Sequence, residues 1–102
     1  MTINLLSGWS LKSWGHVTAF KTGNIVVVSI SGLISNTDVS VDSAFAQIDG
    51  LSPTGFVMAT GKTNYQSGDI ILSARSGETN IYINGAYANE NNYGQLIIPV
   101  NN

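Results

Sequence analysis

The sequence predicts an all-β domain, a small antiparallel β-barrel or sandwich of seven to eight strands. Three observations support this class. Segments rich in β-branched residues alternate between apolar and polar positions, and clusters of Gly, Asn and Ser separate them at intervals of about 8 to 12 residues. No window keeps the apolar spacing of a helix for three turns. A chain of 102 residues has room for one domain, so residues 1–102 are expected to form a single unit.

The first half of the chain opens with the clearest hairpin, "HVTAFKTGNIVVVSIS". Strands over 17–21 and 25–31 flank a turn on residues 22–24, where Gly and Asn favour a tight reversal. The segment "TDVSVDSAFAQI" is ambiguous, because Asp42 can cap a short helical turn over 43–47. Pro53 and Gly55 then precede a strand over 56–60.

The second half contains another hairpin, "DIILSARSGETNIYING", with strands over 70–75 and 79–84 and a turn on 76–78. A last strand over 93–100 reads "YGQLIIPV". Its Pro99 lacks a backbone donor and therefore fits an edge strand or a strand end.

Several strands carry apolar residues on both faces. Val26, Val28 and Ile30 share one face, whereas Ile25 and Val27 lie on the other. The same double pattern occurs around Ile71 and Ile97. A small barrel needs only one apolar face, so the second row indicates either a two-layer core or a subunit interface.

The composition excludes several functions. Charged residues are 10% of the chain, against about 25% in an average domain. Four Lys plus Arg against six Asp plus Glu cannot neutralise a row of phosphates, so nucleic acid is not an expected partner. No cysteine is present, and no apolar run approaches the ~20 residues of a spanning helix, so membrane insertion is not expected. The start lacks the features of a signal peptide, which favours release within an assembled particle.

Four segments in order, "KTGNIVVVSISG", "IDGLSPTGF", "SARSGETNIYING" and "YGQLIIPV", follow an opening segment that contains both tryptophans. This order resembles the C-terminal head domain of phage receptor-binding or tail-fibre proteins, most closely those of siphophages of lactic acid bacteria or other Gram-positive hosts. The resemblance implies a homotrimeric head at the distal tail tip of the virion. It also implies attachment to the rest of the tail or baseplate, and binding of host cell-wall or envelope polysaccharide for adsorption. The chain then corresponds to a head excised from a longer tail protein.

Some lactococcal heads hold sugar hydroxyls with a His-x-Asp pair on one strand and an aromatic residue on the next. Here Ile71 and Ser73 stand where that polar pair belongs, although Tyr82 supplies an aromatic ring. The resemblance therefore does not carry that site over whole.

Saccharide recognition needs a flat aromatic face for the C–H side of a sugar ring, with polar groups nearby for its hydroxyls. The segment "GWSLKSWGH" contains both tryptophans and the only histidine. As one extended strand it would turn Trp9 and Leu11 toward the core, and Trp14 with Lys12 and His16 to the other face. Trp14 and His16 are therefore candidate ligand contacts. The alternative is that both tryptophans are core or interface residues.

Three further segments combine aromatic and polar residues. The strand "TNIYING" turns Asn80 and Tyr82 outward and Ile81 and Ile83 inward. The loops "GAYANENNYGQ" and "KTNYQSGD" are the other two. Each segment has an ordinary alternative, a solvated strand face or a plain turn. The candidate residues in these segments are Tyr65, Asp69, Asn80, Tyr82, Tyr87, Asn89 and Glu90.

Catalysis is not expected. His16 is the only histidine to serve as a base, no G-x-S-x-G motif is present, and the six acidic residues lie mostly in turns. One histidine without clustered acids predicts no metal site, and no cofactor is expected. Two other roles stay open: a structural trimerisation cap of a tail fibre or baseplate without a ligand, and a lectin-like module unrelated to phage.

Overall fold

The structure is a computed structural model that describes residues 1–101, and it is all-β, as the sequence predicts. Eight strands are joined by turns and one short 3₁₀ turn. Their bounds are β1 Ile3–Leu5, β2 Trp9–Thr22, β3 Ile25–Ser35, β4 Ser43–Ile48, β5 Val57–Thr63, β6 Asp69–Ala74, β7 Asn80–Asn84 and β8 Asn92–Pro99, with the 3₁₀ turn η1 at Tyr65–Ser67.

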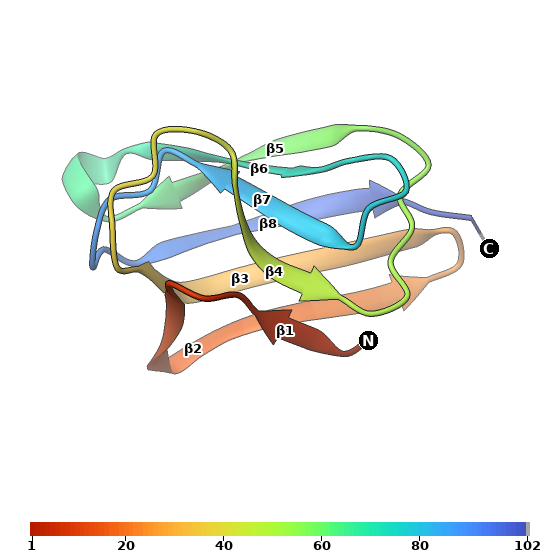
Figure 1. Cartoon of the computed structure of the whole chain (residues 1–102), viewed down its shortest axis with the longest axis horizontal. Coiled ribbons are helices and arrows are strands. Elements are labelled where there is room, and N and C mark those ends of the chain that lie inside the picture. Colours follow the sequence, from red (N-terminus) through yellow and green to blue (C-terminus); the bar gives the residue numbers. More distant parts are fainter. Residues whose placement is uncertain (102) are drawn as a thin grey trace.

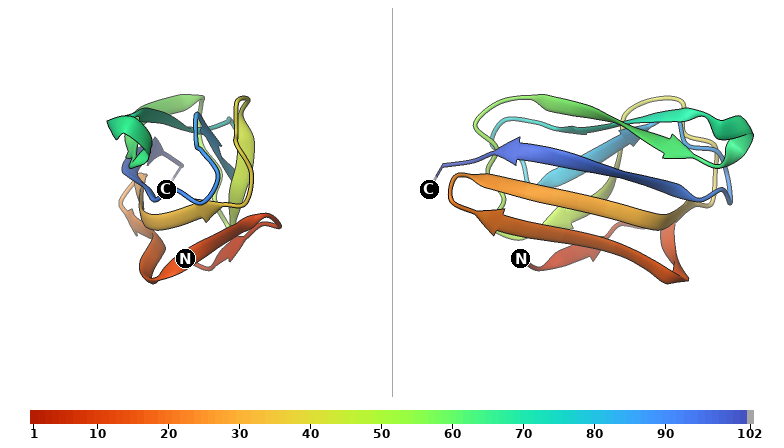
Figure 2. Two further views of the ribbon diagram at one scale, coloured as in Figure 1. Left: turned by 90° about the vertical axis from the view of Figure 1, so that its left-hand side faces the viewer. Right: turned by 180° about the vertical axis from the view of Figure 1, so that it is seen from behind.

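The eight strands form one antiparallel sheet in the order β1-β4-β7-β6-β5-β8-β3-β2. The sheet curls so that its two edge strands, β1 and β2, approach each other, which gives a nearly closed barrel (Figure 1 and the left view of Figure 2). Within residues 1–101 no ladder joins β1 to β2. The molecule is elongated along the strands, with extents of 38 × 24 × 20 Å.

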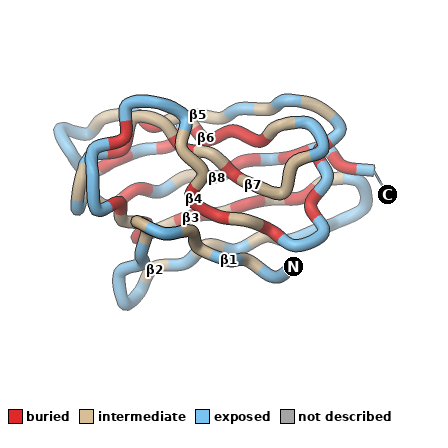
Figure 3. The backbone as a smooth tube through the Cα atoms, viewed as in Figure 1, coloured by how far each residue is buried: buried red, intermediate tan, exposed pale blue. Residues whose placement is uncertain are grey.

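The core fills the barrel interior with alternate residues of the strands (Figure 3). Val26, Val28 and Ile30 of β3 are buried there, as the alternation predicts. Apolar residues of β6, β7 and β8 complete it: Ile70, Leu72, Ala74, Ile81, Ile83, Leu96 and Ile98. The second apolar row is not buried in a second layer. Ile97 is exposed, and Ile25 and Val27 are half-buried on the outside of the sheet.

One local alternative is wrong, and one strand was not predicted. The helical turn considered for 43–47 is instead strand β4, because this segment pairs with both β1 and β7 and buries Phe45. Ladder bonds on two sides outweigh the weak local preference that a capping residue gives. Strand β1 was not predicted, since three residues are too few for a periodic signal. Pro99 ends β8 beside β3, so the strand-end alternative is the correct one.

Strands β5 and β8 cross closely at Gly61 and Gly94. A Cβ atom added to Gly61 would lie 2.7 Å from the Tyr93 carbonyl oxygen and 2.9 Å from Ile70 Cγ1. A Cβ on Gly94 would lie 2.9 Å from the Gly61 Cα. Only glycine allows this approach, which brings the loop after β5 beside the loop before β8.

We expect Gly61→Ala to lower the free energy of unfolding by about 1–3 kcal/mol, because the added methyl group overpacks a backbone contact. Urea unfolding followed by circular dichroism measures the change. Gly55→Ala is the matched control: a Cβ there meets no atom within 4 Å, so a change within about 0.5 kcal/mol is expected. Equal stability of both variants would contradict the close crossing.

Candidate functional site

Three exposed aromatic residues that carry polar ring atoms, Trp14, Tyr65 and Tyr87, lie at one end of the barrel. Four connections meet there, at the left of Figure 1: the corner of β2 at residues 12–15, the loop 36–42, the loop containing η1, and the loop 85–91. Trp14, Tyr65 and Tyr87 belong to three of them, and their exposed fractions are 58%, 40% and 42%. Large aromatic side chains this exposed are candidates for ligand contact. We call this end of the barrel the loop end.

The loop end joins two segments that the sequence analysis treated separately. The rings of Tyr65 and Tyr87 lie 4.3 Å apart between centroids, with 33° between their planes. Tyr65 belongs to η1 and Tyr87 to the loop before β8, so 22 positions of chain separate them. Each ring covers part of the other and keeps the rest of its surface in solvent. The result is a stacked pair of tyrosine rings, which we call the aromatic platform, with carbonyl, amide and carboxylate groups in the same two loops.

The backbone of these two loops is unusual. Among the described residues, the non-glycine residues with positive φ are Gln66 at 52°, Ser67 at 52° and Asn89 at 64°. All three flank the tyrosine pair in sequence. A left-handed backbone costs energy for any residue except glycine, and such conformations occur more often at ligand sites than elsewhere. The polar side chains of Gln66 and Asn89 are exposed there.

Hydrogen bonds hold the loop that carries Tyr87. The Asn64 amide donates to the Asn91 carbonyl at 3.0 Å, which joins this loop to the η1 loop. The Asn89 amide donates to the Ser35 carbonyl at 2.8 Å, and the Ala88 amide to Asp38 Oδ1 at 2.9 Å. The segment just after Tyr87 is therefore tied to the η1 loop, to the end of β3 and to the loop 36–42.

Asn92 anchors the base of the same loop. Its side chain is fully buried and donates to the Leu33 carbonyl at 2.9 Å and to the Glu90 carbonyl at 3.1 Å. Its Oδ1 is buried without a hydrogen-bond partner among the described residues. The sequence analysis did not single out Asn92, because nothing in "NENNYG" distinguishes a buried asparagine from its exposed neighbours.

Trp14 and His16 lie at and beside the corner of β2. Leu11 pairs with Leu33 and His16 pairs with Ser31, so residues 12–15 stand opposite Gly32 alone. Gly32 has φ +64°, and a Cβ on it would lie 2.7 Å from Gly15 Cα and 3.2 Å from the Trp14 ring. Only glycine permits this contact, so the Trp14 ring lies against bare backbone.

The structure corrects part of the prediction for the opening segment. Trp9 packs against the core, with its ring centroid 5.9 Å from that of Phe45, and Trp14 and His16 are exposed, as predicted. Leu11 pairs with the buried Leu33 and so lies on the core side of β2, but it is 37% exposed and does not pack into the core. The alternation holds on both sides of the corner, and Leu11 is exposed because β2 is an edge strand with a neighbour on one side only. The corner also connects to the loop end, since the Gly32 amide donates to Asn91 Oδ1 at 2.8 Å.

Asp69 is engaged by a neighbour. Lys62 Nζ lies 2.5 Å from Asp69 Oδ1 across the β5–β6 ladder, and both side chains are largely exposed. This hydrogen bond and the negative charge raise the pKa of the Lys62 ammonium above its usual 10.5. The Asp69 carboxylate can accept a hydrogen bond from a second donor, but its negative charge is already paired with the Lys62 ammonium.

Asn80 and Tyr82 lie away from the loop end, on the outside of β7. The Tyr82 hydroxyl donates to Glu78 Oε1 at 2.6 Å, and the Arg75 guanidinium carbon lies 3.9 Å from the centre of the ring. The hydrogen bond to Glu78 raises the pKa of the Tyr82 phenol above its usual 10.0. One face of this ring and its hydroxyl group are therefore already used within the chain.

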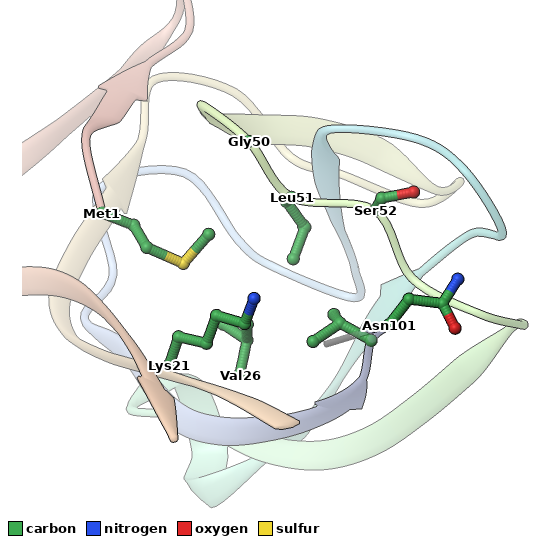
Figure 4. A pocket seen from close by; sticks show the side chains of 8 residues that line it. Met1, Lys21, Val26, Gly50, Leu51, Ser52 and Asn101 are labelled. Atoms are coloured by element: carbon green, nitrogen blue, oxygen red, sulfur yellow. The ribbon is translucent and has the colours of Figure 1, made fainter. Parts of the chain in front are cut away.

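A hollow lies at the opposite end of the barrel and is lined by other residues (Figure 4). It encloses about 220 Å³ of space open to solvent, and Lys21, Leu51 and Val100 are among its lining residues. None of the candidate residues lines it, so the loop end remains the main candidate site.

Residues 1–101 contain no group of three or more His, Cys, Asp or Glu side chains arranged to hold a metal ion. No helix in that part of the chain is long and apolar enough to cross a membrane.

The fold and the loop end define a class: a small, eight-stranded, barrel-shaped antiparallel β protein with an exposed aromatic platform on the loops at one end. Comparison with protein-family models, curated proteins and solved structures finds no match.

Proposed function

We propose that this chain is the receptor-binding head of a phage tail, which adsorbs to host cell-wall or envelope polysaccharide through the loop end. The observation that carries this proposal is the Tyr65–Tyr87 pair, two exposed rings brought together from separate loops. A hydrophobic pair without a ligand would gain by burial, whereas these rings keep about two-fifths of their surface in solvent.

The chemistry of the platform suits a sugar. The two rings are stacked, so their outer faces point in different directions, and each outer face offers an apolar surface for the C–H side of a pyranose. Asn89 and Glu90 follow Tyr87 in its loop and supply acceptors and donors for hydroxyl groups, and Gln66 does the same beside Tyr65. Lys62 is already paired with Asp69, so no free cation flanks the pair in the η1 loop. A neutral or amino sugar therefore fits better than an acidic one.

Trp14 and His16 form the second part of the proposed site. The Trp14 ring is exposed at the corner of β2, and the Gly32–Asn91 hydrogen bond ties this corner to the loop that carries Tyr87. A polysaccharide covers several sugar units, so two aromatic positions at one end of the barrel can bind successive units. Asn80 and Tyr82 lie on a different surface and belong to the proposed site only if Arg75 moves off the ring.

The proposed setting is the distal tail tip of a virion, with the head assembled as a homotrimer and joined to the rest of the tail or baseplate. Each loop end binds weakly, in roughly the millimolar to micromolar range, because contacts with hydroxyl groups mostly replace contacts with water. Several heads on one particle then give firm adsorption. The proposal includes no catalytic step and no cofactor.

One observation favours a second candidate, a structural trimerisation cap without a ligand. Large apolar side chains remain exposed on the outside of the sheet, among them Phe20 and Ile97. A cap needs such a surface for contact with its neighbours and needs no aromatic platform.

Titration with saccharides tests the proposed function. Fragments of lactic acid bacterial envelope polysaccharide are added to the ¹⁵N-labelled protein, and amide and indole signals are followed by NMR. We expect saturable shifts at Tyr65, Tyr87 and their loops, extending to the Trp14 indole. Shifts confined to Tyr82 would place binding on β7 instead. A flat response to all fragments, with the spectrum of a folded protein, would favour the structural cap.

A further inference from the structure

Two buried polar atoms lie unpaired at the loop end. Thr63, the last residue of β5, is 1% exposed, and Asn92, the first residue of β8, is 0% exposed. Neither Thr63 Oγ1 nor Asn92 Oδ1 has a hydrogen-bond partner among residues 1–101. The two residues stand opposite each other in the β5–β8 ladder, so their Cβ atoms are about 5 Å apart. Burial without a hydrogen bond costs free energy, so two such atoms on one cross-strand pair point to a ligand group.

The chemistry of this pair selects a hydroxyl group. The Thr63 hydroxyl can donate a hydrogen bond, whereas Asn92 Oδ1 can only accept one. A hydroxyl group between them accepts from Thr63 and donates to Asn92, so it satisfies both atoms at once. A carboxylate has no proton for Asn92, and an ammonium group has no acceptor for the Thr63 proton. The Asn92 amide nitrogen is already used, since it donates to the Leu33 and Glu90 carbonyl oxygens.

The η1 turn packs directly on Thr63 at the left end of Figure 1. The Thr63 amide donates to the Gly68 carbonyl at 3.0 Å, and a Cβ atom added to Gly68 would lie 3.3 Å from Thr63 Cγ2. Residues 64–67 are all exposed, so this part of the turn contributes nothing to the core. One backbone hydrogen bond and the tyrosine pair attach it to the loop 85–91. A segment with so few contacts can lift while the barrel stays folded.

The backbone of the turn is strained. Gln66 and Ser67 both have φ 52°. The Gly68 amide donates to the Tyr65 carbonyl at 2.9 Å, which closes a type I′ turn around them. Type I′ turns favour Asn-Gly at the two central positions, because a left-handed backbone costs energy for most residues. The turn between β6 and β7 shows the usual solution, since Gly77 takes its left-handed position at φ 73°. The closed η1 turn therefore carries strain that opening releases.

We propose that Thr63 and Asn92 form a buried hydroxyl-binding subsite and that the η1 turn is the lid over it. When the lid lifts, one hydroxyl group of the saccharide bonds to Thr63 Oγ1 and Asn92 Oδ1. The strain and the two unpaired atoms are both costs of the closed form, so the open form is a populated minor state that the ligand stabilises. This inference rests on the proposed function for its ligand, and it adds to that function a specific hydroxyl contact beside the aromatic platform.

Thr63→Val separates a subsite from an ordinary core position. The change replaces the hydroxyl by a methyl group and keeps a β-branched residue in the strand. Because the hydroxyl is buried without a partner, the melting temperature is expected to stay the same or rise. The affinity for the envelope saccharide fragment, measured by isothermal titration, is expected to fall about threefold to tenfold. Thr60→Val is the matched control, since Thr60 is exposed on the same strand, and its affinity is expected to be unchanged.

Unchanged affinity in Thr63→Val, or an equal loss in Thr60→Val, would overturn the subsite. A lower melting temperature in Thr63→Val with unchanged affinity would show that a water molecule, rather than a sugar hydroxyl, lies between the two atoms. If no fragment binds the wild-type protein, the proposed function and the subsite are both wrong, and the lid is decided without ligand.

Relaxation-dispersion NMR on the ligand-free protein tests the lid by itself. Exchange on the millisecond timescale is expected at the amides of residues 63–68 and absent at the Gly77 turn. Ser67→Gly relieves the left-handed strain of the closed form, so it is expected to reduce this exchange contribution at least about threefold. Ser76→Gly, at an exposed turn residue without a positive φ, is the control and is expected to leave it unchanged. A wild-type protein without exchange, or exchange that Ser67→Gly leaves unaltered, would overturn the lid whether or not a saccharide binds.

Discussion

Tyr87→Ala and Tyr65→Ala are each expected to weaken binding of the envelope saccharide at least about tenfold, which corresponds to about 1.4 kcal/mol. Each substitution removes half of the platform and lets the remaining ring turn away, because the rings support each other at 4.3 Å between centroids. Isothermal titration or NMR titration with the best fragment measures the loss. Both residues are exposed, so the fold is expected to remain.

The matched control is Tyr93→Ala. Tyr93 is exposed by 41%, nearly as much as Tyr65 and Tyr87, but it lies beside Lys62 at the start of β8 rather than in the pair. Unchanged affinity is expected for this variant. Because the two rings touch, the double variant is expected to lose less than the sum of the single losses. Full additivity, or equal loss in the control, would show that the pair is not one platform.

Asn92→Asp is expected to lower the free energy of unfolding by about 3–5 kcal/mol at neutral pH. The change removes two hydrogen-bond donors and places a carboxylate against the Leu33 and Glu90 carbonyl oxygens in a fully buried position. Asn92 is the first residue of β8 and anchors the end of the loop that carries Tyr87. Saccharide affinity is therefore expected to fall as well. Urea unfolding and the same titration measure the two effects.

The loss in Asn92→Asp is expected to depend on pH. Burial beside carbonyl oxygens favours the neutral acid, so the folded-state pKa of the new carboxyl group lies above its unfolded value of about 3.9. The penalty is therefore smallest below about pH 4 and grows as the pH rises toward the folded-state pKa. Asn24→Asp, in the exposed turn between β2 and β3, is the control and is expected to change stability by less than about 0.5 kcal/mol. A loss independent of pH would contradict this account.

Most of the strands could be predicted from the sequence, because alternation and turn chemistry are local. The hairpin of β2 and β3 turns at Gly23 and Asn24, as predicted, with Gly23 at φ 59°. Ile81 and Ile83 point inward and Tyr82 points outward, as the period of two requires. The ends of the strands could not be predicted as well. The predicted strands over 17–21 and 25–31 are longer in the structure, where β2 begins at Trp9 and β3 extends to Ser35, because pairing continues past the regular part of the alternation.

The candidate residues were chosen by type, and the structure separates them by place. Tyr65 and Tyr87 touch, whereas the ring of Tyr82 is covered by Arg75. Asn89 and Glu90 follow Tyr87 in its loop, and Asp69 is paired with Lys62. No sequence pattern could show which of these residues meet, since Tyr65 and Tyr87 come from loops that adjoin only because β5 crosses β8 at Gly61 and Gly94.

The sequence by itself determined the all-β class, the inward rows of the core, the main hairpins and the uncharged polar surface, because each depends on the spacing and type of nearby residues. Only the tertiary structure decided that 43–48 is a strand, that Leu11 is exposed, and that the second apolar row lies on the outside of the barrel. It also joined the two tyrosine loops. These features depend on pairing between segments distant in the chain, whose energies outweigh local preference and leave no periodic mark in the sequence.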